Sequence, residues 1–160
     1  VDTDKAGKCL LYFGCRNTDD HIYNSTITKW NKSNVLEPSI AFSREPSTPK
    51  TYVQDLIEQS SKNICQLLLQ PETCYYICGD ARVADFCFEA CVKALRAHGN
   101  MSRVAAVQHI KQMRAQNRWQ YDLWGIIVHF NEAKYEFKVK KEAGAKNWLK
   151  RFTSASAIKG

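Results

Sequence analysis

The chain has 160 residues, 44% of them hydrophobic and 24% charged, with a formal net charge of +7. This composition is typical of a folded globular domain and excludes a disordered or fibrous chain. No apolar run approaches the roughly 20 residues that a membrane-spanning helix needs. Residues 126–160 carry eight Lys or Arg against three Glu, so +5 of the charge lies there and +2 in residues 1–125. A nucleic-acid interpretation would therefore depend on the C-terminal segment.

Seven cysteines are an odd number, so they cannot all pair within the chain. The group formed by Cys74, Cys78, Cys87 and Cys91 lacks the Cys-x2-Cys spacing of zinc ribbons. Cys87 and Cys91 lie four residues apart in a helical pattern. We therefore predict buried, reduced cysteines and no metal site, which indicates a reducing, intracellular compartment.

Strand and helix patterns alternate along the chain. Short apolar runs predict buried strands, at Cys9–Phe13, Ser39–Phe42 and Cys74–Cys78. Helical periodicity marks four further segments, the second of them broken near Ser60: residues 19–30, 53–69, 83–98 and 101–113. This alternation predicts a three-layer α/β domain, with helices on both faces of a parallel sheet. Ligands of such sheets bind beyond the carboxyl ends of the strands.

Polar and cationic residues follow the predicted strands. Ser43 and Arg44 come directly after the second strand, and Lys50 and Tyr52 follow within ten residues. A phosphate needs a fixed cation with hydroxyl or amide donors, which Ser43, Arg44 and Lys50 would supply. The Tyr52 ring offers a flat face for a purine. Each signal is weak alone, because such a turn is usually a solvated loop and Cys78, at the end of a strand, is usually part of a core.

Five motifs occur in a fixed order: Phe13-Gly14-Cys15-Arg16-Asn17, Ala41-Phe42-Ser43-Arg44-Glu45, Lys50-Thr51-Tyr52-Val53-Gln54-Asp55, Tyr76-Ile77-Cys78-Gly79-Asp80-Ala81 and Tyr121-Asp122-Leu123-Trp124. In this order and spacing they resemble the C-terminal part of the diflavin reductases. That family includes the microsomal NADPH–haem-protein reductases, methionine synthase reductase, the sulfite reductase flavoprotein and the nitric oxide synthase reductase domain. The likeness covers about residues 9–124. It implies a fold of the ferredoxin–NADP reductase C-terminal type.

The resemblance implies where the adenosine half of NADPH would bind. Ser43, Arg44, Lys50 and Tyr52 match the residues that hold the adenosine 2′-phosphate and so select NADPH over NADH. Gln54 matches a neighbouring adenosine contact. Arg16 matches a residue near the cofactor's phosphates.

The resemblance also implies where hydride transfer would occur. Cys78 and Asp80 match the pair beside the nicotinamide, Asp122 a carboxylate that steers the transfer, and Trp124 the aromatic ring that covers the flavin and must move aside. A thiol and a carboxylate can stabilise the positive charge that develops on the nicotinamide. Three structural alternatives stay open: a core position for Cys78, a surface charge for Asp122 and a packing anchor for Trp124.

By the same resemblance, NADPH delivers hydride to FAD, and single electrons pass through FMN to a haem protein or another acceptor. FAD and FMN would be held mainly by domains that the chain does not contain, so we expect no reductase turnover from the chain alone. We interpret residues 1–125 as the NADPH-binding domain, truncated at its N-terminal edge. The family's first strand and glycine-rich pyrophosphate turn have no match before Cys9. The stretch Asp80–Asp85 is one residue shorter than the family pattern.

Residues 126–160 form a basic extension beyond the position where most relatives end. Alternating residues predict a hairpin over Ile126–Lys141, and a short helix is expected over Ala145–Phe152. Nitric oxide synthases also continue past this point, into a tail that restrains flavin reduction. The extension is therefore either an accessory hairpin, which we favour, or a segment that modulates access to the flavin.

Two other functions remain as alternatives. One is a single-flavin reductase of the ferredoxin type. The other is a non-enzymatic module that binds nucleic acid through its basic tail. A run of charge is more often a solvated face, so we expect no nucleic-acid partner. We expect the protein in the cytoplasm, or on the cytoplasmic face of an internal membrane if a membrane anchor precedes this segment.

Overall fold

The computed structural model describes residues 7–124, in which strands and helices alternate. The predicted boundary at residue 125 and the extension at 126–160, with its expected hairpin and helix, lie outside the described residues. No helix within the described part of the chain is both long and apolar enough to cross a membrane. The elements are β1 Leu10–Cys15, a 3-10 turn Thr18–Asp20, α1 Asn24–Lys32, β2 Glu37–Phe42, α2 Val53–Gln59, α3 Ser61–Leu68, β3 Tyr75–Asp80, α4 Ala81–His98, α5 Arg103–Ala115 and β4 Trp119–Trp124.

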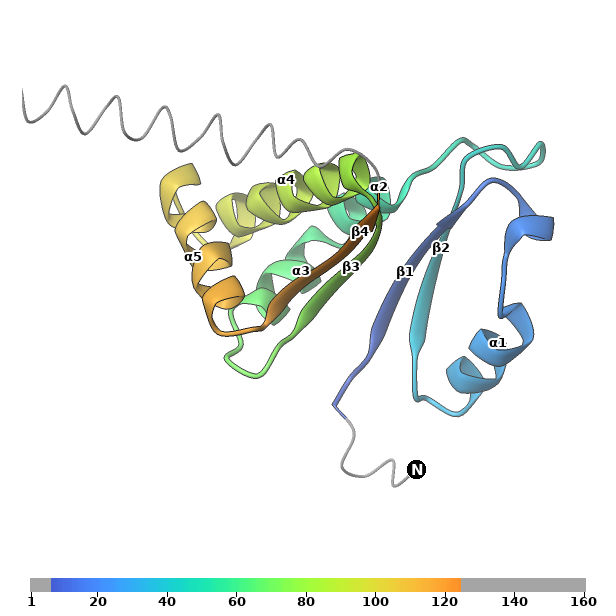
Figure 1. Ribbon diagram of the computed structural model, residues 1–160, viewed down its shortest axis with the longest axis horizontal. Coiled ribbons are helices and arrows are strands. Elements are labelled where there is room, and N and C mark those ends of the chain that lie inside the picture. The colour runs from blue at the N-terminus through green and yellow to red at the C-terminus, as the bar shows by residue number, and fades with distance from the viewer. Residues whose placement is uncertain (1–6, 125–160) are drawn as a thin grey trace, which may run out of the picture.

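The four strands form two parallel pairs. β1 pairs with β2 in a register that ends at Cys15 opposite Phe42, and β3 pairs with β4 in a register that ends at Asp80 opposite Trp124. Within residues 7–124 the two pairs are not hydrogen-bonded to each other. Figure 1 shows β1 facing β3, with the carboxyl ends of all four strands at the same end of the molecule. The predicted α/β fold with parallel strands is confirmed, but the described strands are divided between two pairs instead of forming one sheet.

Helix α4 forms the centre of the core. It begins directly after β3, where the Asp80 side chain caps it by accepting a 2.9 Å hydrogen bond from the Arg82 N–H. It contacts β3, β4, α2, α3 and α5. On its inner side, Trp119 stacks on Tyr75 with ring centroids 4.3 Å apart. Its buried residues recur at the three- and four-residue spacing of a helix face: Ala81, Ala84, Cys87, Phe88, Ala90, Cys91, Val92, Ala94 and Leu95.

The prediction of buried cysteines is only partly right. The three buried thiols are Cys65, Cys87 and Cys91. Burial raises the pKa of both Cys87 and Cys91 to about 12, so these two thiols stay neutral at physiological pH. Cys74 and Cys78 are exposed, because Cys74 precedes β3 and Cys78 shares the outward face of that strand with Tyr76. Among residues 7–124, no three His, Cys, Asp or Glu side chains are grouped to hold a metal ion.

The pair β1–β2 is contacted by α1 and by α2. At Gly14 the backbone of β1 approaches α2 so closely that an added Cβ would lie 2.7 Å from Val53 Cγ2. Val53 is the first residue of α2, so this contact places the start of that helix and the preceding Tyr52 beside the end of β1. Because Gly14 has no side chain, α2 can pack closely against β1, and this packing positions the loop that carries Lys50 and Tyr52.

We expect Gly14→Ala to lower the free energy of unfolding by about 1–3 kcal/mol, because the new methyl group overlaps a branched side chain in a packed contact. Urea denaturation measures the loss. Gly7→Ala is the matched control: nothing lies within 4 Å of a Cβ built at Gly7, so its effect should stay below about 0.5 kcal/mol. Equal stability of the two variants would contradict the close approach of β1 and α2.

Candidate functional site

The loops that follow β1 and β2 are joined backbone to backbone. The Ser43 N–H donates to the Cys15 carbonyl at 3.0 Å, and the Arg44 N–H donates to the Arg16 carbonyl at 2.6 Å. The Ser43 hydroxyl donates to the same Cys15 carbonyl at 3.3 Å. Arg16 and Arg44, two of the predicted phosphate ligands, therefore leave the backbone at neighbouring points.

A carboxylate lies between these two cations. Asp20 accepts hydrogen bonds from Arg16 Nε and from Arg16 Nη2, the second at 3.0 Å. The hydrogen bond from Arg16 lowers the pKa of Asp20, and the charges of Arg16 and Arg44 lower it further. Both arginines thus act on one carboxyl group. An exposed ion pair of this kind stabilises the fold little, so Arg16 can exchange Asp20 for another anion at small cost.

The loop from Ser43 to Thr51 folds back onto β2, since the Thr51 N–H donates to the Phe42 carbonyl at 2.9 Å. Lys50 Nζ lies 5.2 Å from the centroid of the Tyr52 ring, which is 43% exposed. The Tyr52 N–H donates to Asp55 Oδ2 at 2.8 Å and fixes the start of α2. Gln54 is half-buried in the first turn of that helix. A purine stacked on Tyr52 would therefore lie close to the Lys50 ammonium group.

The second pair of strands presents a thiol and a carboxylate side by side. Cys78 and Asp122 are opposite each other in the register of β3 and β4, and Cys78 Sγ lies 3.8 Å from Asp122 Oδ2. Both side chains are exposed, as are Tyr76 and Trp124, which is 61% exposed. Cys78 is therefore not a core residue of the described fold, whereas the role of Trp124 as a packing anchor stays a prediction.

Asp80 lies at the end of β3, two residues after Cys78, and is half-buried. Its Oδ1 accepts from both the backbone N–H and the side chain of Arg82, at 2.9 Å and 3.0 Å. The side-chain hydrogen bond from Arg82 is the main reason why the pKa of Asp80 is lowered. No residue separates β3 from α4, so this cap sets the sharp turn that follows Gly79, whose φ is +154°.

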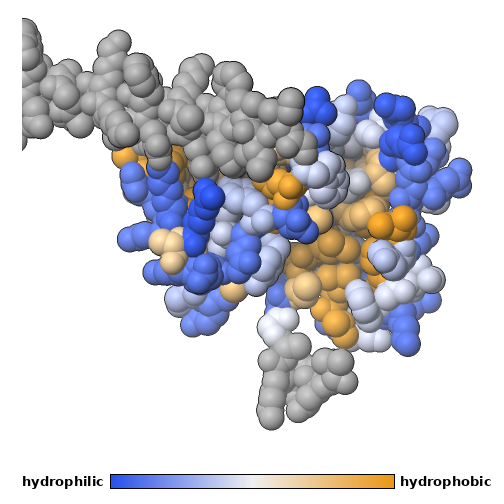
Figure 2. All heavy atoms as spheres, viewed as in Figure 1, coloured by the Kyte–Doolittle hydropathy of each residue, from blue (hydrophilic) through white to orange (hydrophobic). Residues whose placement is uncertain are grey.

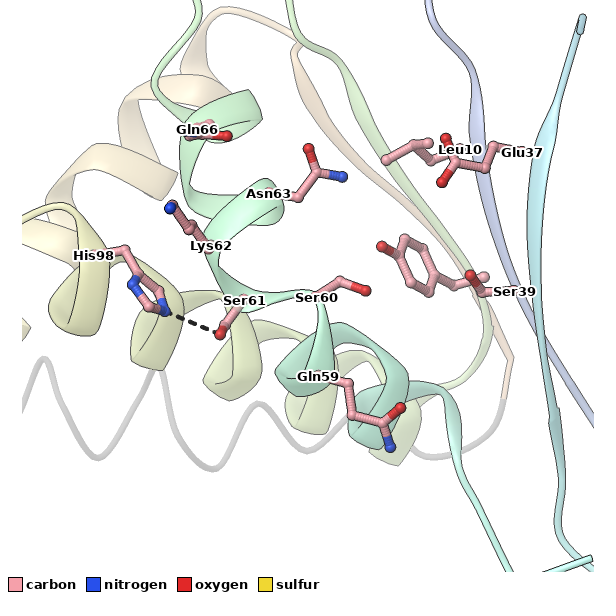
Figure 3. Close-up of a pocket in the computed structure, with 11 residues that line it drawn as sticks. Leu10, Glu37, Ser39, Gln59, Ser60, Ser61, Lys62, Asn63, Gln66 and His98 are labelled. Carbon is pink, nitrogen blue, oxygen red and sulfur yellow. Dashed lines mark hydrogen bonds between the residues drawn. The ribbon is translucent and has the colours of Figure 1, made fainter.

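A cavity of about 530 Å³ lies elsewhere, between α3 and the pair β1–β2 (Figure 3). Leu10 and Glu37 line it from the amino-terminal ends of β1 and β2, the opposite end from Arg16 and Arg44. Its far wall includes Ser61 and His98, whose Oγ and Nε2 are 3.0 Å apart. The cavity is thus separate from the place where the predicted site residues gather.

Sequence reasoning missed the acidic residues among these cations. It assigned roles to Arg16 and Arg44 but none to Asp20, which pairs with Arg16, or to Glu45, which contacts Thr18. The available signal was spacing: Asp20 lies four residues after Arg16, and Glu45 directly follows Arg44.

Parallel strands with cations and hydroxyls at their carboxyl ends form a nucleotide-binding arrangement. Residues 1–89 match the family described as the oxidoreductase NAD-binding domain. The chain belongs to this family. The match runs from before β1 into α4, so this NAD-binding domain includes the loops of Arg16 and Arg44 and the exposed Cys78.

Individual relatives agree with this assignment. The chain is 42% identical over 120 residues to the NADPH–cytochrome P450 reductase of Drosophila melanogaster and 34% identical over 131 residues to the nitric oxide synthase of the same organism. It is 37% identical over 125 residues to the NADPH–cytochrome P450 reductase of Candida maltosa. The three matches cover 74%, 81% and 74% of this chain but only 18%, 10% and 18% of the relatives. The predicted resemblance is confirmed, and the matched segment spans less than a fifth of the length of each of these relatives.

Proposed function

We propose that this NAD-binding domain binds NADPH and presents it to a flavin in a larger reductase. In that protein hydride passes from NADPH to FAD, and single electrons pass through FMN to a haem protein or a similar acceptor. One observation carries the proposal: Arg16 and Arg44 follow one strand pair, the Cys78–Asp122 contact lies near the carboxyl end of the other, and the carboxyl ends of both pairs lie at the same end of the molecule (Figure 1). A dinucleotide has a phosphate-rich half and a reactive half that need such separate sites.

The adenosine half would bind at the ends of β1 and β2. Ser43, Arg44 and Lys50 supply a hydroxyl and two cations for the 2′-phosphate, the feature that distinguishes NADPH from NADH. Tyr52 offers its exposed ring to the purine. Gln54 would contact the adenosine, and Arg16 would lie near the cofactor's other phosphates.

The nicotinamide would lie at the ends of β3 and β4. Cys78 and Asp122 place a polarisable thiol and a negative charge where the nicotinamide becomes positive as hydride leaves. Asp80 holds the turn next to them by capping α4. Trp124, exposed at the end of β4, would cover the flavin ring. FAD, when bound, supplies the hydride acceptor, while the protein positions the reacting groups and sets their field.

A further parallel strand, supplied by the segment before this domain, would fill the space between β1 and β3. Leu10 to Phe13 of β1 are all apolar, yet each is only half-buried. Figure 2 shows hydrophobic side chains on the surface over β1 and β2. A buried central strand should be covered on both edges, because unpaired backbone groups and apolar side chains are both costly to leave in water. The turn after such a strand would place backbone N–H groups between the two halves of the site, where the pyrophosphate must cross.

We expect Arg44→Ala in the full-length protein to weaken binding of 2′,5′-ADP by about 10- to 100-fold, because a charge-assisted hydrogen bond to the 2′-phosphate is lost. Binding of 5′-AMP, which lacks that phosphate, should change little. Calorimetric titration measures both. Arg96→Ala, which removes an exposed arginine from the last turn of α4, is the matched control. A wild-type protein that binds the two nucleotides equally well would refute selection for NADPH.

We expect Asp122→Asn to slow flavin reduction by NADPH at least about tenfold in stopped-flow measurements, since a negative charge is removed where positive charge develops. Affinity for 2′,5′-ADP should be unchanged because the adenosine site is on the other strand pair. Glu72→Gln, an exposed charge before β3, serves as the control. An unaltered rate in Asp122→Asn would remove this carboxylate from the hydride-transfer step.

The additional strand predicts a difference in amide hydrogen exchange. In the isolated 160-residue chain, the β1 amides that β2 does not bind should exchange rapidly, while in the full-length protein a second neighbour should protect them at least about tenfold more. Amides inside α4, which are bonded within their own helix, provide the internal reference. Equal protection of β1 in both proteins would show that no strand is added there.

A further inference from the structure

Glu45 is a carboxylate on the loop of the proposed phosphate site, directly after Arg44. Its Oε2 accepts two hydrogen bonds from one residue, from the Thr18 N–H at 2.9 Å and from the Thr18 hydroxyl at 2.8 Å. These bonds lower the pKa of Glu45, so it is charged at neutral pH. Thr18 and Glu45 are 27 residues apart and belong to the loops after β1 and β2. Both donors therefore connect one arginine-bearing loop to the other.

We propose that Glu45 is a positioning residue for the adenosine 2′-phosphate: its contact with Thr18 fixes the loop that carries Arg44 against the loop that carries Arg16. This inference rests on the proposed function and adds to it a residue that acts through Arg44 without touching the nucleotide.

The contact completes a set of ties on both sides of Arg44. Before it, Ser43 is bonded to Cys15. The Arg44 N–H donates a hydrogen bond to the Arg16 carbonyl. After Arg44, the Glu45 carboxylate accepts a hydrogen bond from Thr18. An arginine side chain is long and loses much rotamer freedom when it binds, so fixing its backbone on both sides favours binding.

The partner of Glu45 is itself part of the cationic site. Thr18 begins the 3-10 turn that ends at Asp20, and Asp20 holds the Arg16 guanidinium. Asn17 caps the same turn, its Oδ1 accepting from the Asp20 N–H at 3.2 Å. One short turn thus anchors Glu45 at its start and Arg16 at its end, and so sets the spacing of the two arginines.

Positioning and simple electrostatics predict opposite effects of removing Glu45. Glu45→Ala raises the local charge by one unit, so Coulomb attraction alone would tighten binding of a phosphate. If Glu45 positions Arg44, the same substitution weakens that binding because the loop loses its tie. Whether phosphate affinity rises or falls in Glu45→Ala therefore distinguishes positioning from simple electrostatics.

The test is calorimetric titration of 2′,5′-ADP and 5′-AMP into the full-length protein and its variants. We expect Glu45→Ala to lower the preference for 2′,5′-ADP over 5′-AMP by about fivefold, and Thr18→Val, which removes the hydroxyl donor without changing charge, by about threefold. The double variant should be no worse than Glu45→Ala, because both substitutions break the same contact. Glu45→Gln, which keeps an acceptor oxygen, should fall between wild type and Glu45→Ala.

Glu37→Ala is the control for charge, since it removes a carboxylate from the amino-terminal end of β2. It should leave the preference within about twofold of wild type. Tighter or unchanged binding of 2′,5′-ADP in Glu45→Ala would overturn the inference, as would equal weakening of 5′-AMP or additive effects in the double variant. If Glu45→Ala does not fold, an unchanged preference in Thr18→Val overturns it alone. A wild-type protein without any preference would refute the proposed function and this inference together.

Discussion

Parallel pairing of neighbouring strands is the constraint on which the site depends. Because β1 and β2 run in the same direction and end in register, the loops that leave them meet, and the same holds for β3 and β4. For this reason the backbones of Arg16 and Arg44 are hydrogen-bonded to each other although the two residues are far apart in the sequence. Cys78 and Asp122, which are 44 residues apart, face each other for the same reason. An antiparallel partner would have sent one member of each set to the opposite end.

Electrostatic balance, and not cationic charge alone, characterises the proposed adenosine end of the site. Arg16 is paired with Asp20, and Glu45 is hydrogen-bonded to Thr18, so the loops that carry the two arginines carry carboxylates as well. Paired cations keep the loops folded without a ligand, whereas unpaired cations close together would repel one another. In the proposed complex, a phosphate would replace the Asp20 carboxylate at Arg16. Such replacement would lower affinity and favour reversible binding, so that the oxidised nucleotide could leave after each turnover of the proposed reaction.

The sequence predicted the alternation of strands and helices and the break of the second helical segment near Ser60. Prediction from the sequence failed for features that depend on contacts between distant parts of the chain. β4 was not predicted, although Trp119–Trp124 alternates apolar and polar residues, because that signal is short and follows a helix closely. Cys78 was weighed as a core residue because strand faces cannot be distinguished without knowing which side α4 covers. The roles of Asp20 and Glu45 depend on contacts between loops that no local pattern encodes.

The two halves of the site belong to strand pairs that are not hydrogen-bonded to each other in residues 7–124, so another element must set the distance between them. Among the described elements, α2 connects the two pairs, since it contacts β1 and β2 and also α4, which contacts β3 and β4. The helix also begins directly after Tyr52. It packs so closely on Gly14 that a methyl group added there would overlap the Val53 side chain. A shift of this seven-residue helix would therefore move the proposed adenosine site relative to the Cys78–Asp122 pair, which α4 supports. The proposed hydride transfer would require reacting atoms held about 3–3.5 Å apart, so the packing of α2 would affect its rate although the helix lies outside the reaction itself.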